Sequence, residues 1–127
     1  MRKKTIWITG GSTGIGKALA IKFANKDWNV AISARRVELL NELSNSYKNI
    51  STFPLDVTDK LKCKEVFNEI KDKFENIDIC FFSTGTWNPK KEKDIDVEQM
   101  EDVFKVNFFG TVNSIKAVEE YLSLIHI

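Results

Sequence analysis

A glycine-rich turn between a strand-like run and a helical stripe is the feature that most constrains this sequence. Residues 9–18 read TGGSTGIGKA. Before them, residues 4–9 form a run of β-branched and aromatic side chains, and after them Ile15, Leu19 and Phe23 recur every four residues. The pattern predicts a strand that passes through a tight turn directly into a helix.

The same alternation continues along the chain. We expect strands at residues 29–33, 51–55 and 77–82, the last almost wholly apolar, as for a parallel strand covered on both faces. We expect helices over residues 37–44, 59–74 and 97–122, the second capped by Thr58 or Asp59 and the third interrupted by Asn107 and Gly110. Strands that alternate with helices predict an α/β fold with a doubly wound parallel sheet.

Length and charge narrow the function classes. The 127 residues fit one domain, and 19 basic residues nearly balance 18 acidic ones, so the sequence gives no reason to expect nucleic acid or a membrane as partner. No apolar stretch reaches membrane-spanning length. Cys63 and Cys80 show no metal-ligand spacing, so we expect no metal site, two free core thiols and a cytoplasmic protein.

The glycine-rich turn fits two kinds of phosphate loop. From Gly11 it reads G-x-x-x-x-G-K, nearly the P-loop of a nucleoside triphosphate hydrolase. That loop needs a hydroxyl after its lysine to ligate Mg²⁺, and here Ala18 follows Lys17. The P-loop interpretation is therefore disfavoured, with Lys17 expected on the exposed side of the helix.

A dinucleotide turn uses every glycine of the motif. Gly10 allows the sharp turn off the strand, Gly14 lets the backbone approach a pyrophosphate, and Gly16 allows the helix to pack closely. Ser12 and Thr13 add hydroxyl donors. The alternative is that the glycines only shape a tight turn.

Five motifs in order resemble the short-chain dehydrogenase/reductase family. Thr9, Gly10, Gly14, Ile15 and Gly16 match its T-G-x-x-x-G-[IL]-G cofactor loop. The resemblance continues over about residues 3–122, and its further matches are Asp56-Val57, Asp78, Gly85 and Val106-Asn107-x-x-Gly110.

The resemblance implies a Rossmann-like fold and a role for each matching position. Asp56 would accept a hydrogen bond from the adenine amino group, with Val57 beside the ring, although Asp56 could instead cap a helix. Gly85 would border the nicotinamide ribose. Asn107 would help hold a water of the proton relay, the one catalytic position of the family present here. The family's N-N-A-G at the end of the fourth strand is replaced by FSTG at residues 82–85, which puts the polar tie between the central strands in doubt.

Two arginines follow the second predicted strand, where an acidic residue would select NAD. Arg35 and Arg36 offer planar, permanently charged groups suited to the 2′-phosphate of NADP. We therefore expect NADP(H) rather than NAD(H). The alternative is that both are surface charges paired with Glu38 or Glu42.

The family's catalytic Ser and Tyr-x-x-x-Lys are not found in these residues. Tyr121 has no lysine four positions on, and His126 has no catalytic partner in the sequence. We expect residues 1–122 to be the N-terminal part of an NAD(P)-binding domain, with the sheet ending after about four strands and the following helix, and 123–127 to be a tail of different origin.

Three function hypotheses follow. The first is the cofactor-binding portion of an NADP-dependent oxidoreductase acting on a carbonyl or alcohol, a homo-oligomer at full length. The second is a non-catalytic nucleotide-binding half-domain, and the third a P-loop hydrolase. Trp87 and the loop at residues 86–95 would border the substrate, which the sequence does not identify; the alternative for Trp87 is that it covers apolar surface.

Overall fold

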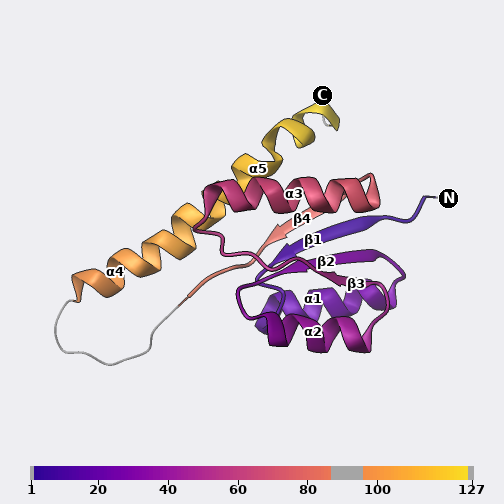
Figure 1. The fold of residues 1–127 in the computed structure, drawn as a ribbon, viewed down its shortest axis with the longest axis horizontal. Helices are drawn as coiled ribbons and strands as arrows, with labels where there is room; N and C mark the ends of the chain where they lie inside the picture. The colour runs from indigo at the N-terminus through magenta and orange to yellow at the C-terminus, as the bar shows by residue number, and fades with distance from the viewer. Residues whose placement is uncertain (1, 87–95, 126–127) are drawn as a thin grey trace.

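The computed structural model describes residues 2–86 and 96–125, with side chains described as far as Leu122. The elements alternate along the chain (Figure 1). In chain order they are β1 (Thr5–Thr9), α1 (Gly14–Asn25), β2 (Asn29–Ser33), α2 (Val37–Ser46), β3 (Ile50–Thr52), α3 (Lys60–Phe74), β4 (Ile79–Phe82), α4 (Val97–Phe104), a π-helical turn (Lys105–Phe109) and α5 (Gly110–Ile125).

The four strands form one parallel sheet in the order β3-β2-β1-β4. Helices α1 and α2 cover one face, while α3 and α5 lie on the other (Figure 1). Alternate residues of β1 point to the two faces, so Trp7 joins the core under α3 and α5, whereas Ile6 and Ile8 join the core over α1 and α2. The predicted α/β fold with a doubly wound, Rossmann-like parallel sheet is confirmed.

The first helix buries mainly small residues against the sheet. Its fully buried residues are Gly16, Ala20 and Ala24, while Leu19 and Phe23 of the predicted stripe are partly buried against the same core. Ile15 is 72% exposed. The small residues lie against the sheet because they allow the helix to approach it closely.

The third strand ends earlier than predicted, two residues before Pro54. Regular pairing ends at Thr52, yet the backbone N–H groups of Phe53 and Leu55 still donate to Ile32 and Ala34. Successive N–H groups of an extended chain point in opposite directions, so the position of Pro54, which has no N–H, faces away from β2.

The fourth strand lies at the edge of the described sheet, as expected for a sheet that ends after about four strands. It pairs with β1 on one side, and no described strand pairs with its other side. Ile79 is 38% exposed, and the other three residues of β4 are half-buried. Both faces of the strand contact a core, as its apolar sequence predicts, because Cys80 and Phe82 pack on the α3 and α5 side and Phe81 packs on the α1 and α2 side.

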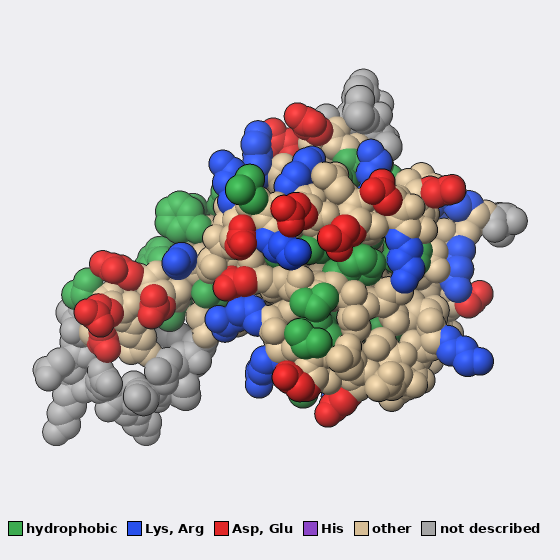
Figure 2. Space-filling model, in the orientation of Figure 1, with side chains coloured by type: hydrophobic (Ala, Val, Ile, Leu, Met, Phe, Trp, Pro, Cys, Tyr) green, Lys and Arg blue, Asp and Glu red, His purple; other side chains and the backbone are tan. Residues whose placement is uncertain are grey.

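The last helical region is continuous rather than broken. Asn107 lies within the π-helical turn, and Gly110 begins α5 without a break. Ala117 and Val118 of α5 are buried against α3. The residues of β1, Thr5 to Thr9, are buried within the sheet. Further apolar side chains along α4, the turn and the start of α5 lie at the surface, as the green atoms at the left of Figure 2 show; they include Val97, Met100, Phe104, Phe108, Phe109, Val112 and Ile115.

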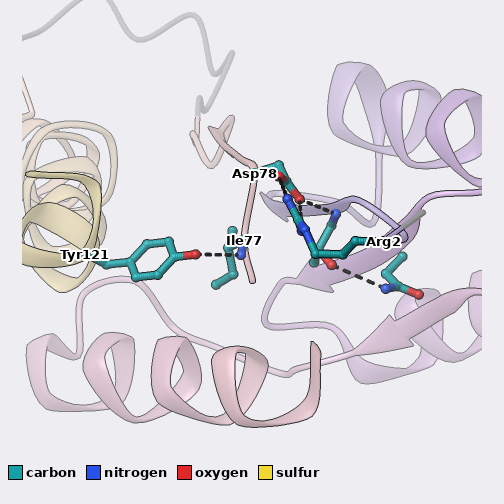
Figure 3. Close-up of polar contacts among 6 residues, drawn as sticks. Arg2, Ile77, Asp78 and Tyr121 are labelled. Carbon is teal, nitrogen blue, oxygen red and sulfur yellow. Dashed lines mark hydrogen bonds and ion pairs between the residues drawn. The ribbon is translucent and has the colours of Figure 1, made fainter. Parts of the chain in front are cut away.

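Polar contacts fix the start of the fourth strand (Figure 3). The Arg2 guanidinium donates to both carboxylate oxygens of Asp78, at 3.0 and 2.6 Å, and the backbone N–H of Thr5 donates to the same carboxylate at 2.8 Å. The Ile77 N–H donates to the Tyr121 hydroxyl at 3.1 Å. Tyr121 therefore lies beside the beginning of this segment, as a structural contact of α5.

Replacing Asp78 by alanine is expected to lower the free energy of unfolding by about 1–3 kcal/mol at neutral pH, because the buried N–H of Thr5 loses its acceptor. The hydrogen bond from Arg2 holds the pKa of Asp78 below its ordinary value, although partial burial opposes this. A lowered folded-state pKa stabilises the protein above the unfolded-state pKa of about 3.9 and loses that contribution as pH falls through the folded-state value. Urea unfolding of both proteins from pH 7 to pH 3 measures the difference.

That difference should shrink below about pH 4. The matched control is Asp72→Ala, which removes an exposed carboxylate of α3. A pH-independent difference for Asp78→Ala would contradict the assigned role of its charge.

Candidate functional site

A cleft of about 520 Å³ opens at the carboxyl ends of the four strands. In doubly wound sheets this edge is where ligands bind. All eleven residues predicted to bind a cofactor line it: Gly10, Ser12, Thr13, Gly14, Ile15, Gly16, Arg35, Arg36, Asp56, Val57 and Gly85. Five further residues line the cleft: Ala34, Leu55, Ser83, Thr84 and Val106. Four of them lie next to a predicted residue or to Asn107, and Ser83 lies two positions before Gly85.

The glycine turn leaves an open cradle at the start of α1. Gly14 has φ +56°, and a Cβ built there would meet nothing within 4 Å. Thr13 is the N-cap, and its side chain makes no capping hydrogen bond. The N–H groups of the first helical turn therefore face a space large enough for a ligand, and the helix dipole favours an anion there.

The other two glycines lock the turn against the end of β4. A Cβ on Gly10, which has φ +70°, would lie 2.8 Å from the backbone carbon of Ser83. A Cβ on Gly16 would overlap the Gly10 carbonyl and approach the Ser83 hydroxyl. Gly16 thus allows contact within the turn itself as well as close packing of α1.

Ser83 provides the link between strands that the changed motif had put in doubt. Its hydroxyl donates to the Thr9 carbonyl at 2.7 Å, and its backbone N–H donates to the same oxygen at 3.1 Å. The tie between the ends of β1 and β4 is therefore present with a serine. Beside it, the Thr84 hydroxyl is buried and has no hydrogen-bond partner among the described residues.

The two arginines lie at the far end of the cleft from Gly85, after β2 and at the start of α2. Both are exposed, and in the described part of the chain neither forms an ion pair with Glu38 or Glu42. The proposed surface pairing is therefore not seen. Two unpaired guanidinium groups at one end of the cleft make that end attractive to an anion.

Asp56 lines the same cleft after β3, the strand next to β2, and is near enough to Arg35 for the charge of that residue to act on it. Partial burial alone would raise its pKa, but hydrogen bonds from the hydroxyl and backbone N–H of Thr58, at 2.7 and 3.0 Å, together with the charge of Arg35, hold the pKa below its ordinary value. Asp59 rather than Asp56 caps α3, accepting from the Lys62 N–H at 3.0 Å. The helix-capping alternative for Asp56 is wrong, and within the described part of the chain its second carboxylate oxygen accepts no hydrogen bond.

Asn107 lies beside the cleft and holds the segment that leaves β4. Its side-chain oxygen accepts from the Thr86 N–H at 2.6 Å, and its side-chain nitrogen donates to the Thr86 carbonyl at 3.0 Å. A Cβ on Gly85 would lie 3.5 Å from that oxygen. The π-helical turn that carries Asn107 is a structure often found at functional sites. Trp87 and residues 88–95 lie outside the described residues.

Replacing Asn107 by alanine should release this segment. Because both bonds to Thr86 are lost, we expect amide hydrogen exchange at Thr86 to accelerate by tenfold or more. Asn107→Asp keeps the acceptor for the Thr86 N–H and should retain most of the protection. Amide-resolved exchange measures both variants, and unchanged exchange at Thr86 in Asn107→Ala would contradict the assigned contact.

The described residues contain neither a membrane-spanning helix nor a cluster of metal-binding side chains. No helix there has both the length and the apolar character needed to cross a membrane. The same part of the chain holds no group of three or more His, Cys, Asp or Glu residues arranged to bind a metal ion.

The chain is similar in sequence to several oxidoreductases. It is 35% identical over 123 residues to an NADPH-dependent 1-acyldihydroxyacetone phosphate reductase of Schizosaccharomyces pombe, covering 94% of this chain and 40% of that protein. It is 29% identical over 117 residues to sulfoacetaldehyde reductase 2 of Chromohalobacter salexigens, covering 89% of this chain and 46% of the relative. The chain spans about half the length of the curated relatives it matches.

Solved structures show the same fold. A structure described as ElxO with NADP bound superposes with a TM-score of 0.87 at 30% identity, covering 97% of this chain and 52% of that one. A short chain dehydrogenase from Bacillus anthracis superposes with a TM-score of 0.89 at 28% identity, covering 98% and 53%.

The family-level comparison covers nearly the whole chain. Residues 4–124 match the sequence profile described as short chain dehydrogenase. The resemblance seen in the motifs therefore holds across the described elements, and this chain belongs to the short-chain dehydrogenase family.

Proposed function

We propose that this chain binds NADP(H) in the cleft, as the cofactor-binding portion of an oxidoreductase that moves a hydride between NADP(H) and a carbonyl or alcohol substrate. The observation that carries the proposal is the convergence of the eleven predicted residues on one cleft, with two unpaired arginines at one end. The NADP named for the ElxO structure and the NADPH dependence named for the yeast reductase support the choice of cofactor.

The shape and donors of the cleft fit a dinucleotide. The open space at Gly14 and the N-terminus of α1 suit a pyrophosphate, with Ser12 and Thr13 adjacent to it. The buried Thr84 hydroxyl without a protein partner suits a polar ligand group in the same cleft. NADP(H), when bound, supplies the hydride, and the residues of this chain bind and orient it.

Each end of the cleft then has a proposed role. Arg35 and Arg36 hold the 2′-phosphate, while the free oxygen of Asp56 accepts from the adenine amino group and Val57 packs beside the ring. Gly85 borders the nicotinamide ribose. Asn107 fixes the segment after Gly85, and by resemblance to the family it helps hold a relay water.

The proton-transfer groups of the family are not among these 127 residues, which contain no Tyr-x-x-x-Lys. We therefore propose that the chain as given binds cofactor without turning over substrate, since a positioned acid or base contributes roughly 100- to 10,000-fold. We propose that residues 1–122 are the N-terminal portion of an NAD(P)-binding domain. Helix α5 continues past that boundary to Ile125. A non-catalytic nucleotide-binding module is the second candidate, whereas Ala18 disfavours a P-loop hydrolase.

Further proposals concern the whole protein. The exposed apolar side chains of α4 and the start of α5 support homo-oligomer formation, as expected from the family resemblance. The free thiols of Cys63 and Cys80 support a reducing, cytoplasmic compartment. Burial raises the pKa of the two thiols to about 11 and about 12, so both stay protonated at neutral pH.

Calorimetric titration of the purified chain with NADPH, NADH and Mg²⁺-ATP tests the proposal. We expect NADPH to bind more tightly than NADH and Mg²⁺-ATP not to compete. Parallel assays with a panel of ketones and aldehydes should show no oxidation of NADPH above a boiled control. Preferential binding of Mg²⁺-ATP would favour the hydrolase instead, and turnover lost in Asn107→Ala would show that these residues contain the catalytic group.

A further inference from the structure

The wall of the cleft at Val57 is held from behind by α5. Val57 is 4% exposed, and it follows Asp56 in the turn between β3 and α3. Its carbonyl accepts from the side-chain nitrogen of Asn113 at 2.9 Å and from the Cys63 thiol at 3.6 Å. The turn itself has few backbone bonds, so these side chains determine where Val57 lies.

Asn113 makes this bond from inside a helix. Asparagine is a poor helix former, and its side chain commonly bonds to its own helix or to solvent when it occurs there. Ser114, the next residue, follows that pattern by donating to the Gly110 carbonyl of its own helix at 2.8 Å. Asn113 instead reaches 56 positions back along the sequence, to the residue beside the predicted adenine position.

Gly110 contacts Val57 from the same helix, one turn earlier. A Cβ built on Gly110 would lie 2.5 Å from Cγ2 of Val57, a distance at which one of the two groups has to move. The backbone of α5 thus lies directly against the Val57 side chain, while Asn113 holds the Val57 carbonyl. Two contacts from one helix define both the position and the orientation of this part of the wall.

We propose that Asn113 is a positioning residue for the adenine end of the cleft, acting through the carbonyl of Val57. The inference rests on the proposed NADP(H) function and adds α5 to the elements that set cofactor affinity. It predicts that losing the bond weakens recognition of the adenosine part of the cofactor and leaves the pyrophosphate site at Gly14 unchanged.

The test uses adenosine 2′,5′-bisphosphate, which carries the adenine, the 2′-phosphate and the adenosine-side phosphate of the cofactor but lacks the nicotinamide half, together with NADPH and inorganic pyrophosphate. In calorimetry on the whole chain, Asn113→Ala should weaken the bisphosphate and NADPH by the same factor, about three- to tenfold for one hydrogen bond. Pyrophosphate affinity should not change. The matched control, Lys64→Met, removes a side-chain bond to the α5 backbone at the Ala117 carbonyl, 3.1 Å, and should leave all three affinities unchanged.

A second variant disturbs the position of Val57 without removing a hydrogen bond. Gly110→Ala favours the helix, by about 1 kcal/mol of propensity, but crowds Val57. It should also weaken the bisphosphate more than pyrophosphate, and it serves as the test if Asn113→Ala does not fold. Wild-type affinity for the bisphosphate in either folded variant would overturn the role of this wall. An unmodified chain that binds neither NADPH nor the bisphosphate would overturn the proposed function and, with it, this inference.

Discussion

Replacing Gly14 by valine is expected to reduce NADPH affinity by at least a hundredfold while leaving the helical circular dichroism signal nearly unchanged. The open space beside Gly14 is the space proposed for the pyrophosphate, so a branched side chain there would block the ligand. Nothing in the protein within 4 Å opposes the new Cβ, which is why the fold should survive. Calorimetry with NADPH measures the loss.

The backbone strain of this change needs its own control. Gly14 has φ +56°, where a side chain costs on the order of 1–2 kcal/mol. Glu75 has φ +68° and follows α3, at the end of the sheet opposite the cleft; it already carries a Cβ, so Glu75→Val adds the strain of a β-branched side chain at positive φ without touching the site. The control should lose stability and keep NADPH affinity. Equal NADPH affinity in Gly14→Val and the unmodified chain would remove the pyrophosphate assignment.

Replacing Arg35 and Arg36 together by alanine should weaken NADPH binding on the order of a hundredfold and change NADH binding little. A hydrogen bond to a charged group is worth about 1.5–3 kcal/mol, and only NADPH has the 2′-phosphate that these arginines would bind. The ratio of the two dissociation constants is the quantity to measure.

General charge effects can be separated from this specific one. Lys22 and Lys26 are exposed on and just after α1, and replacing both by alanine removes the same net charge. That control should lower NADPH affinity only slightly, through the long-range field, which salt screens. If the affinities of the arginine variant for NADH and NADPH fell by the same factor, the arginines would not be binding the 2′-phosphate.

Local pattern was sufficient to predict the fold. The strand at residues 29–33 has the predicted bounds, and the helix predicted at 59–74 begins one residue later with Asp59 as its cap. Periodicity and capping act over a few residues, so the sequence shows them directly. The residues named for the cofactor also line one cleft, because the carboxyl ends of parallel strands meet at one edge of the sheet. Their roles in binding remain predictions.

Contacts between distant residues could not be predicted in the same way. The bond from Ser83 to Thr9, the two bonds from Asn107 to Thr86, and that from Asn113 to Val57 join segments that only the folded sheet and helices bring together. The edge position of β4 was expected from the family resemblance, because apolar composition alone does not show how many strands pair with a given strand.

The contact between the glycine turn and Ser83 sets an order of events during folding. Ser83 lies 74 positions after Thr9, and parallel strands cannot pair through a short hairpin. The turn can form its tight bend early, but the contacts of Gly10 and Gly16 with Ser83 exist only after β4 has docked beside β1. Such non-local pairing is slow relative to helix formation. A chain emerging from the ribosome would therefore carry its complete phosphate motif for some time before it could hold a nucleotide.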